Sequence, residues 1–178
     1  SEIDGKRVPG ISVSEDLAFG EVEPEVTGQL CMTNDEMLDE LTTLVLAAIR
    51  KNPELGIVAL SQMDNAPGCT CAKCKELDDA EGSQSASLLY GVNRGADAVK
   101  KEFPHVYVAT LAYQYTRNPP KTIRPRDNVL VQVCMDARSF YQPIDSEQNK
   151  EMAECIKTWS DLGAKLMILC SEKNWMSH

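Results

Sequence analysis

The sequence has few histidines and lacks the motifs of several large enzyme classes. Its two histidines are His105, which precedes a predicted strand, and His178, the last residue, so neither is placed to be the base of a Ser-His-acid triad. The patterns GxGxxG, GxxxxGKS/T and HExxH are also missing. They are the signatures of dinucleotide, P-loop and zincin sites, so the sequence indicates none of these three kinds of site.

Long apolar runs and an excess of positive charge are missing as well. The longest purely apolar run covers residues 44–49, far short of the roughly 20 residues that span a bilayer, so we expect no membrane span. The first ten residues contain no apolar segment of the signal-peptide type, although a trimmed chain would have lost one. The net charge of −9 argues against a nucleic acid or an anionic membrane as partner.

What the sequence does contain is the composition of a folded domain, with 43% hydrophobic and 25% charged residues. Residues 1–26 carry a net charge of −5 and form an acidic lead-in, where the Asp4-Gly5 pair suggests a hairpin turn. Residues 27–178 alternate between short apolar runs and longer stretches with a 3.6-residue period. This alternation is typical of βαβ units and predicts a single α/β domain.

Five apolar runs predict five strands in series, which indicates a parallel sheet that is covered on both faces. The predicted strands are residues 29–32, 57–61, 106–111, 129–134 and 166–170. Two closures compete at this point. An open doubly wound sheet would be complete at this length, whereas a (β/α)8 barrel needs about 250 residues, so the chain would be a partial TIM-like barrel. A partial barrel exposes its inward side chains, so we expect it to continue beyond residue 178 or to pair with a partner or a second copy.

Three helices are predicted between these strands. The first begins at Thr33, which forms a capping box with Glu36, and ends at Asn52-Pro53. The second runs from about residue 85 to Pro104. Asp145 or Ser146 caps the last helix, and Gly163 ends it. The segment that holds residues 69–74 and the connection between the third and fourth strands are predicted to be loops.

The segments that follow the strands are polar and aromatic, and ligands of parallel α/β folds bind at these carboxyl ends. The candidate catalytic residues are Asp64, Asp136 and Glu172. The candidate substrate-binding residues are Gln62, Asn65, Tyr113, Tyr115 and Arg117. Carboxylates serve general acid-base catalysis, amides and Arg bind hydroxyls or anions, and Tyr rings stack on sugars. The alternative is that these are ordinary loop residues, with Asp64 beginning an Asx turn.

The connection between the third and fourth strands is basic in an otherwise acidic chain, because it contains Arg117, Lys121, Arg124 and Arg126. A positive rim suits an anionic group such as a carboxylated sugar. A loop that balances nearby acidic residues is the alternative, and we favour it.

Cys69, Cys71 and Cys74 form the most specific local pattern, with three thiols within six residues. Thiolates at this spacing suit tetrahedral Zn²⁺, which takes four ligands. Cys31 is the first candidate for the fourth ligand, and Cys134 is the next. A thioredoxin-type pair begins a helix directly after a strand, and no helix is predicted there, so a redox catalyst is disfavoured. A structural metal and a local disulfide both remain open.

Several segments together resemble one family in order and spacing. They are Gln29-Leu-Cys-Met-Thr-Asn34, Ser61-Gln-Met-Asp64 followed by Cys69-x-Cys-x-x-Cys74, Glu81-Gly-Ser83, Leu111-Ala-Tyr-Gln-Tyr-Thr-Arg117 with Pro119-Pro-Lys121, and Pro125-Arg-Asp-Asn-Val129. The family is a large bacterial one, long catalogued as a domain of unknown function. Some of its members are glycoside hydrolases that act as endo-β-N-acetylglucosaminidases on complex N-glycans. The resemblance covers about residues 1–178.

The resemblance implies a (β/α)8-like barrel in a longer, exported polypeptide, hence an extracellular or periplasmic protein with a glycan as its ligand. Hydrolysis of a 2-acetamido sugar would use the acetamide of the substrate as nucleophile and two carboxylates, Asp64 among them, with no cofactor. The sequence departs from the family at Ala137, Arg138 and Ser139, where members tend to carry Glu and further Cys. The alternative function is therefore a non-catalytic carbohydrate-binding or assembly module.

Overall fold

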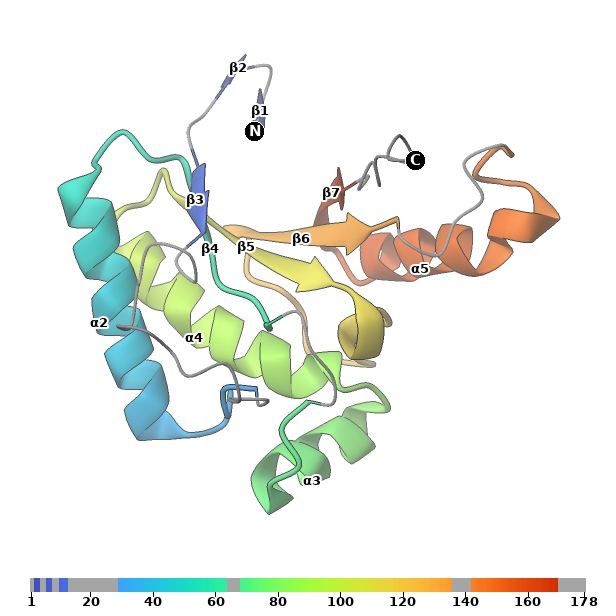
Figure 1. Ribbon diagram of the computed structural model, residues 1–178, viewed down its shortest axis with the longest axis horizontal. Helices are drawn as coiled ribbons and strands as arrows, with labels where there is room; N and C mark the ends of the chain where they lie inside the picture. The colour runs from blue at the N-terminus through green and yellow to red at the C-terminus, as the bar shows by residue number, and fades with distance from the viewer. Residues whose placement is uncertain are drawn as a thin grey trace, which may run out of the picture.

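The computed structural model contains one five-stranded sheet, and all of its neighbouring strands are parallel (Figure 1). It describes the backbone of residues 2–3, 6–7 and 10–12, and the backbone and side chains of residues 29–63, 68–135 and 142–169. The strands of the sheet are β3 (Gly10–Ser12), β4 (Ile57–Ala59), β5 (Tyr107–Ala112), β6 (Val129–Cys134) and β7 (Lys165–Leu169). Before them, β1 (Glu2–Ile3) and β2 (Lys6–Arg7) pair antiparallel.

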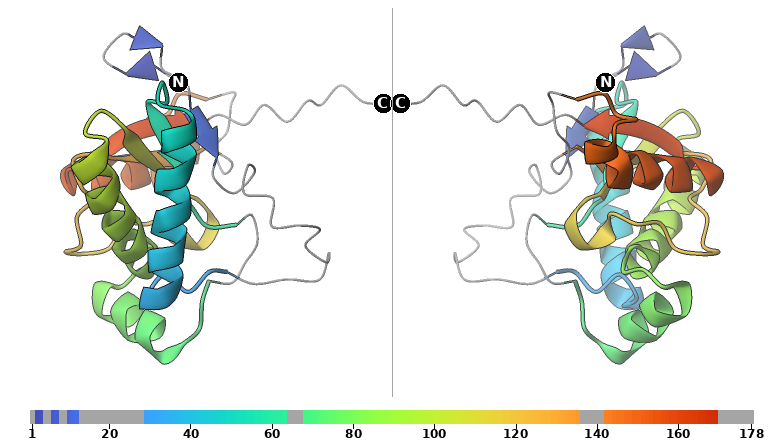
Figure 2. Two further views of the ribbon diagram at one scale, coloured as in Figure 1. Left: turned by 90° about the vertical axis from the view of Figure 1, so that its left-hand side faces the viewer. Right: turned by 90° about the vertical axis from the view of Figure 1, so that its right-hand side faces the viewer.

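Four helices and two 3-10 turns connect the strands in the described part of the chain. The helices are α2 (Asp35–Lys51), α3 (Ala72–Glu81), α4 (Ser85–Glu102) and α5 (Lys150–Asp161), and the 3-10 turns are η1 (Gln114–Thr116) and η2 (Glu147–Asn149). Figure 2 shows α2 and α4 side by side, with α3 beyond the end of α4 and away from the strands. None of these described helices has the length and apolarity that a membrane crossing requires.

The strand order decides between the two predicted closures. Each strand of the sheet lies beside its neighbours in the sequence, in the order β3-β4-β5-β6-β7, with no reversal. A doubly wound sheet reverses its order at a switch point, whereas a barrel keeps adding strands in one direction. The fold is therefore α/β, with parallel βα units that form part of a (β/α)8, TIM-like barrel.

One face of the sheet carries the main hydrophobic core, because alternate residues of a strand point to opposite faces. Val58, Val108 and Val131 point toward the helices and are fully buried. Side chains from α2, α4 and α5 complete the same core, among them Trp159 of α5, which is only 2% exposed. These three helices thus cover the same face of the sheet, as they do in a barrel.

The other face of the sheet is more sparsely covered by the described residues. Ile57, Ala109 and Leu130 form a small second cluster there, with Tyr107 and Met167 packed at its edge. In the register of the sheet Ile57 lies opposite Tyr107, and Ala109 lies opposite Leu130 on the next strand. This face is the one that would line the interior of a closed barrel.

Two predicted elements need correction. Residues 29–32 are not a strand: residues 29–31 have no regular structure, and the first strand of the sheet is β3, three residues within the acidic segment 1–26. The segment that holds residues 69–74 is predicted to be a loop, but α3 begins within it, at Ala72. Apolar periodicity does not reveal α3, since only Cys74 and Asp78 are buried among its ten residues.

The other strands and helices lie where the sequence predicts them, but the residues that cap α2 and α5 differ from the prediction. β4 to β7 and α4 fall where the apolar patterns place them. Asn34, not Thr33, caps α2, because its side chain accepts a hydrogen bond from the backbone N–H of Met37 (3.1 Å). The last helix begins later than expected: Ser146 precedes η2, and α5 follows from Lys150.

Candidate functional site at the carboxyl ends of the strands

The carboxyl ends of β4 and β5 are joined by the side chain of Gln62. Its Nε2 donates to the backbone oxygen of Tyr113 (3.1 Å) and to Oγ1 of Thr116 (2.7 Å). Gln62 is 9% exposed and Thr116 is fully buried. A buried polar group is costly unless it is hydrogen-bonded, so this junction fixes the two strand ends relative to each other. The Gln62 amide proposed to hold a ligand is therefore already bonded to the protein through its nitrogen.

The 3-10 turn η1 after β5 has an unusual backbone. Gln114, its first residue, has a φ of +50°, and it is the one non-glycine residue with positive φ in the described part of the chain. This left-handed region is unfavourable for residues other than Gly, Asn and Asp. Thr116 Oγ1 donates to the backbone oxygens of Leu111 (3.1 Å) and Tyr113 (3.0 Å), which stabilises the turn. Strain of this kind is concentrated at functional sites.

Tyr113 and Tyr115 have different surroundings although only one residue separates them. The backbone of Tyr113 is extended, so it continues the alternation of β5 and places its half-buried side chain on the face that would line a barrel. Tyr115 is packed against the backbone of Gly68, where an added Cβ would lie 2.8 Å from Cε2 of the ring. Burial raises the pKa of Tyr115 to about 12, with Asp78 and Cys69 acting in the same direction.

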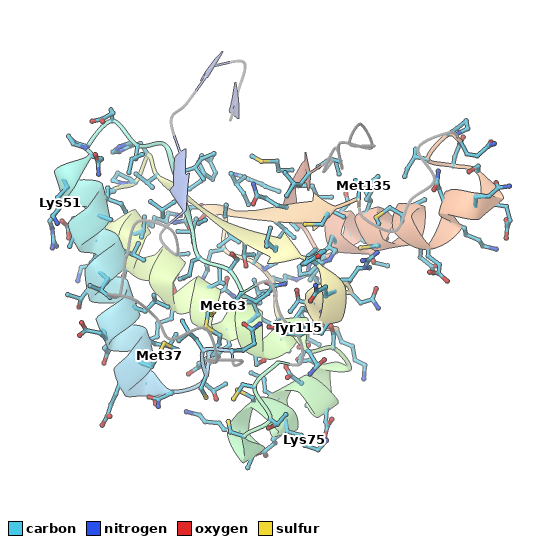
Figure 3. All side chains as sticks on the ribbon, in the orientation of Figure 1. Met37, Lys51, Met63, Lys75, Tyr115 and Met135 are labelled. Carbon is cyan, nitrogen blue, oxygen red and sulfur yellow. The ribbon has the colours of Figure 1, made fainter. Side chains whose placement is uncertain are left out.

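A small cavity lies beside this junction, with Met63 and Tyr115 on its walls (Figure 3). Gln62, Gln29 and Cys69 also line it. Its volume is ≈ 20 Å³, which is room for about one water molecule and too little for a sugar ring. A ligand of that size could bind only outside this cavity.

Arg117 faces a different part of the molecule. It lines two clefts beside α5, together with Glu151 of that helix. Its backbone oxygen accepts hydrogen bonds from Trp159 Nε1 (2.7 Å) and Cys155 Sγ (3.2 Å). The structure thus brings Gln62 and Tyr115 to one cavity, and Arg117 to the clefts by α5.

The basic connection between β5 and β6 is used to hold the loop to neighbouring helices. Arg126 pairs with Asp97 of α4 through two hydrogen bonds of 2.8 and 3.0 Å, and Arg124 Nη1 donates to the backbone oxygen of Leu162 (2.6 Å). Glu81 accepts from the backbone N–H of Thr122 (2.6 Å). For Arg126, the prediction that this loop balances nearby acidic residues is therefore confirmed.

Four predicted residues lie outside the described residues. They are the candidate catalytic residues Asp64, Asp136 and Glu172 and the candidate binding residue Asn65. Their roles stay predictions. Gln62 and Met63, at the end of β4, mark where the segment with Asp64 and Asn65 begins, and Met135 marks where the segment with Asp136 begins.

The structure brings Cys31 together with Cys69, Cys71 and Cys74. Their four Sγ atoms all lie within 4.8 Å of one another. Cys31 Sγ is 3.6 Å from Cys71 Sγ and 3.8 Å from Cys74 Sγ. Cys134, the second candidate for the fourth ligand, lies in β6 and is not part of this group. A cluster of four thiols can hold a metal ion.

The thiols of the cluster have unequal environments. Cys71 caps the N-terminus of α3, where its Sγ accepts from the backbone N–H of Cys74 (3.4 Å). This bond, together with hydrogen bonds from Cys31 and Cys74, lowers the pKa of Cys71 to about 6. Burial raises the pKa of Cys74 to about 12 and also raises the pKa of Cys69. Of these three thiols, the exposed Cys71 is therefore the one that ionises most readily.

Sequence reasoning missed several residues that shape the site. Gln29 holds its segment to the end of β4, because its side chain donates to the oxygen of Met63 (2.9 Å) and accepts from the N–H of Met63 (3.0 Å). Thr33 Oγ1 lies 3.1 Å from Cys74 Sγ. Asp78 accepts from the N–H of Ser87 (2.8 Å) and so caps α4 from the neighbouring helix. None of these long-range contacts leaves a local signal in the sequence.

In comparisons with known proteins, the chain matches a family model and is similar to a solved structure. The model of a family described as Domain of unknown function (DUF4838) matches residues 3–174. No curated protein matches the chain. The crystal structure of beta-N-acetylhexosaminidase from Bacteroides fragilis NCTC 9343 is similar at 17% sequence identity with a TM-score of 0.47. The similarity covers 77% of this chain and 24% of that chain, so this chain spans about a quarter of that protein's length.

Proposed function

Because the chain belongs to the family described as Domain of unknown function (DUF4838), we propose that it is part of a glycoside-hydrolase-like barrel. In this proposal its ligands are glycans that contain N-acetylglucosamine, as the resemblance of the sequence implies. They bind at the carboxyl ends of β4, β5 and β6, where ligands of parallel barrels bind.

The observation that supports a binding site at these strand ends is the turn η1, which follows β5. Gln114 is held there at a φ of +50° by a buried junction of Gln62 and Thr116, and this turn follows Tyr113 directly. The extended backbone of Tyr113 directs its ring to the face that lines a closed barrel. A half-buried aromatic ring at this edge suits stacking on the apolar face of a sugar.

The catalytic part of the proposal rests on the carboxylates after the strands. Asp64 would orient the acetamide of the substrate or protonate the leaving oxygen, with Asp136 or Glu172 as the second carboxylate. Asn65 would hold the glycan together with Tyr113, whereas Arg117 faces the clefts beside α5. The step uses no cofactor, and the four cysteines serve the fold. We also propose an extracellular or periplasmic location, where such glycans are met.

The binding part is tested by calorimetric titration of the chain with N,N′-diacetylchitobiose. Cellobiose is the matched ligand control, because it has the same linkage without the acetamides. We expect Tyr113→Ala to weaken binding about tenfold, which corresponds to about 1.4 kcal/mol. Tyr90→Ala, which changes an exposed tyrosine of α4, should bind as the unchanged chain does. Equal titration curves for both sugars would contradict the proposal.

The catalytic part is tested by release of reducing sugar from chitobiose-containing N-glycans, with Asp64→Asn as the variant. Turnover that falls by about 100-fold or more in Asp64→Asn supports its role as acid or orienter. Unchanged turnover in the variant excludes Asp64 from the mechanism. Binding without any turnover by the unchanged chain selects the non-catalytic binding module instead.

A further inference from the structure

The four-cysteine cluster has the dimensions of a metal site. Zn²⁺ binds thiolate sulfur at about 2.3 Å in a tetrahedron, so two ligand sulfurs lie about 3.8 Å apart. The distances from Cys31 Sγ to Cys71 Sγ and Cys74 Sγ, 3.6 and 3.8 Å, agree with this value. Cys69 belongs to the same group, in which no two sulfurs are more than 4.8 Å apart. Four ligands from one chain are the full set that a closed structural zinc site uses.

The same distances distinguish a metal site from a disulfide. A disulfide joins two sulfurs at about 2.05 Å, much closer than the Sγ of Cys31 lies to either of its two neighbours in the cluster. Here Cys31 lies almost equally far from two partners, and Cys69, Cys71 and Cys74 are free thiols as well. A set of four sulfurs around one point is the arrangement that a tetrahedral ion requires, and a disulfide does not produce it.

The local backbone also prepares these residues for a metal. Cys71 and Cys74 stand on either side of the first turn of α3, and the N–H of Cys74 donates to Cys71 Sγ (3.4 Å). A hydrogen bond of this kind orients a ligand sulfur and stabilises it as a thiolate. Thr33 Oγ1, 3.1 Å from Cys74 Sγ, can donate in the same way to a thiolate and comes from the segment that precedes α2.

The position of the cluster shows what a metal would do there. Cys31 precedes α2, whereas the other three ligands lie on the segment that follows β4 and opens α3. Helix α3 has only two buried residues and lies away from the sheet (Figures 1 and 2). A cross-link between these segments holds α3 in place without an apolar face.

We propose that Cys31, Cys69, Cys71 and Cys74 form a zinc-tetrathiolate site that fixes α3 and the segment before it against residues 29–33. The site is structural, since four protein ligands leave no open position for a substrate. The proposal does not depend on the proposed carbohydrate function, because it uses only the geometry of the four thiols and of α3.

Metal analysis of the full chain, purified without chelators, tests the proposal directly. We expect about one zinc per chain. Titration of Co²⁺ into the metal-free chain should produce the intense visible absorption of a tetrahedral thiolate site. Cys31→Ser and Cys74→Ser should each weaken metal affinity by more than about 100-fold, because even the loss of a residue that only orients a ligand costs 10- to 100-fold.

Cys155→Ser is the matched control. Cys155 is buried in α5, and a serine hydroxyl can still donate to the backbone oxygen of Arg117 as the thiol does. This variant should keep its zinc. Circular dichroism checks that Cys31→Ser, whose cysteine is only half-buried, remains folded.

Three results would overturn the proposal. The first is a metal-free protein in which a thiol count under denaturing conditions shows the four cysteines oxidised. The second is iron in place of zinc. The third is a folded Cys31→Ser variant that binds zinc as tightly as the unchanged chain.

Discussion

Helices α3 and α4 follow each other in the chain and are held by different forces. Eleven of the 18 residues of α4 are buried, among them Leu89, Val92 and Val99 of the main core. In α3 only Cys74 and Asp78 are buried among ten residues. An isolated helix shorter than about 12 residues is marginal in water, so α3 needs its cap, its thiols and its bonds to neighbours. Apolar packing holds α4, and specific polar and sulfur contacts hold α3.

The largest effect is expected from a substitution that disrupts the apolar packing of α4. Leu89→Ala removes a side chain that is 1% exposed and should lower the free energy of unfolding by about 3 kcal/mol, through lost burial and the cavity left behind. Leu77→Ala, on the half-buried side of α3, should cost less than about 1 kcal/mol. Urea unfolding followed by circular dichroism measures both changes. Equal losses would show that α3 is packed like α4.

A smaller effect is expected where α3 caps α4. Asp78 accepts from the N–H of Ser87 (2.8 Å) and from its Oγ (3.1 Å), whereas the cap residue of α4 itself makes no side-chain capping bond. Asp78→Ala should therefore destabilise the protein by about 1 to 2 kcal/mol. Asp79→Ala, which removes only the exposed pair with Lys75, should change the free energy of unfolding by less than about 0.5 kcal/mol. A cost for Asp79→Ala as large as that for Asp78→Ala would contradict the capping role.

The smallest effect concerns the end of α3 and depends on pH. Hydrogen bonds from the side chain and backbone of Thr122 lower the pKa of Glu81 below its ordinary value of 4.5. Because the pKa is lower in the folded state than in the unfolded state, the carboxylate stabilises the fold fully above the ordinary value of 4.5. This stability is lost as pH falls through the folded pKa. When the pH is lowered from about 6 to about 3, the free energy of unfolding should therefore fall less in Glu81→Gln than in the unchanged chain.

Glu76→Gln is the control for this pH dependence, since Glu76 is an exposed residue of the same helix. Its unfolding free energy should follow the same pH curve as that of the unchanged chain. Matching curves for Glu81→Gln and the unchanged chain would mean that the Glu81 carboxylate does not hold the loop between β5 and β6.

The same contrast explains what could be predicted from the sequence. Strands β5 and β6 and helix α4 bury apolar side chains at regular spacing, so periodicity finds them. Helix α3 has no apolar stripe, and β3 contains a single apolar residue, Ile11, so periodicity finds neither. The spacing of three cysteines within six residues is local and marks the cluster.

Contacts between segments that lie far apart in the chain could not be predicted from the sequence. The sequence favours Cys31 as the fourth ligand because it predicts a strand over residues 29–32 that places Cys31 near the strand end. Cys31 joins the cluster, but from a segment with no regular structure that the Gln29 side chain holds to Met63. The left-handed Gln114 and the bonds between Gln62 and Thr116 depend on the packed ends of β4 and β5. Only the folded chain brings these groups together.

The most direct test of the central claim, that sulfur ligation of zinc holds α3, is hydrogen exchange of the full chain with and without zinc. Removal of the metal should raise the exchange rates of the amides of residues 72–81 by about tenfold or more, because α3 then opens locally, and should leave the buried interior of α4 unchanged. Equal protection of α3 in both states would contradict the account.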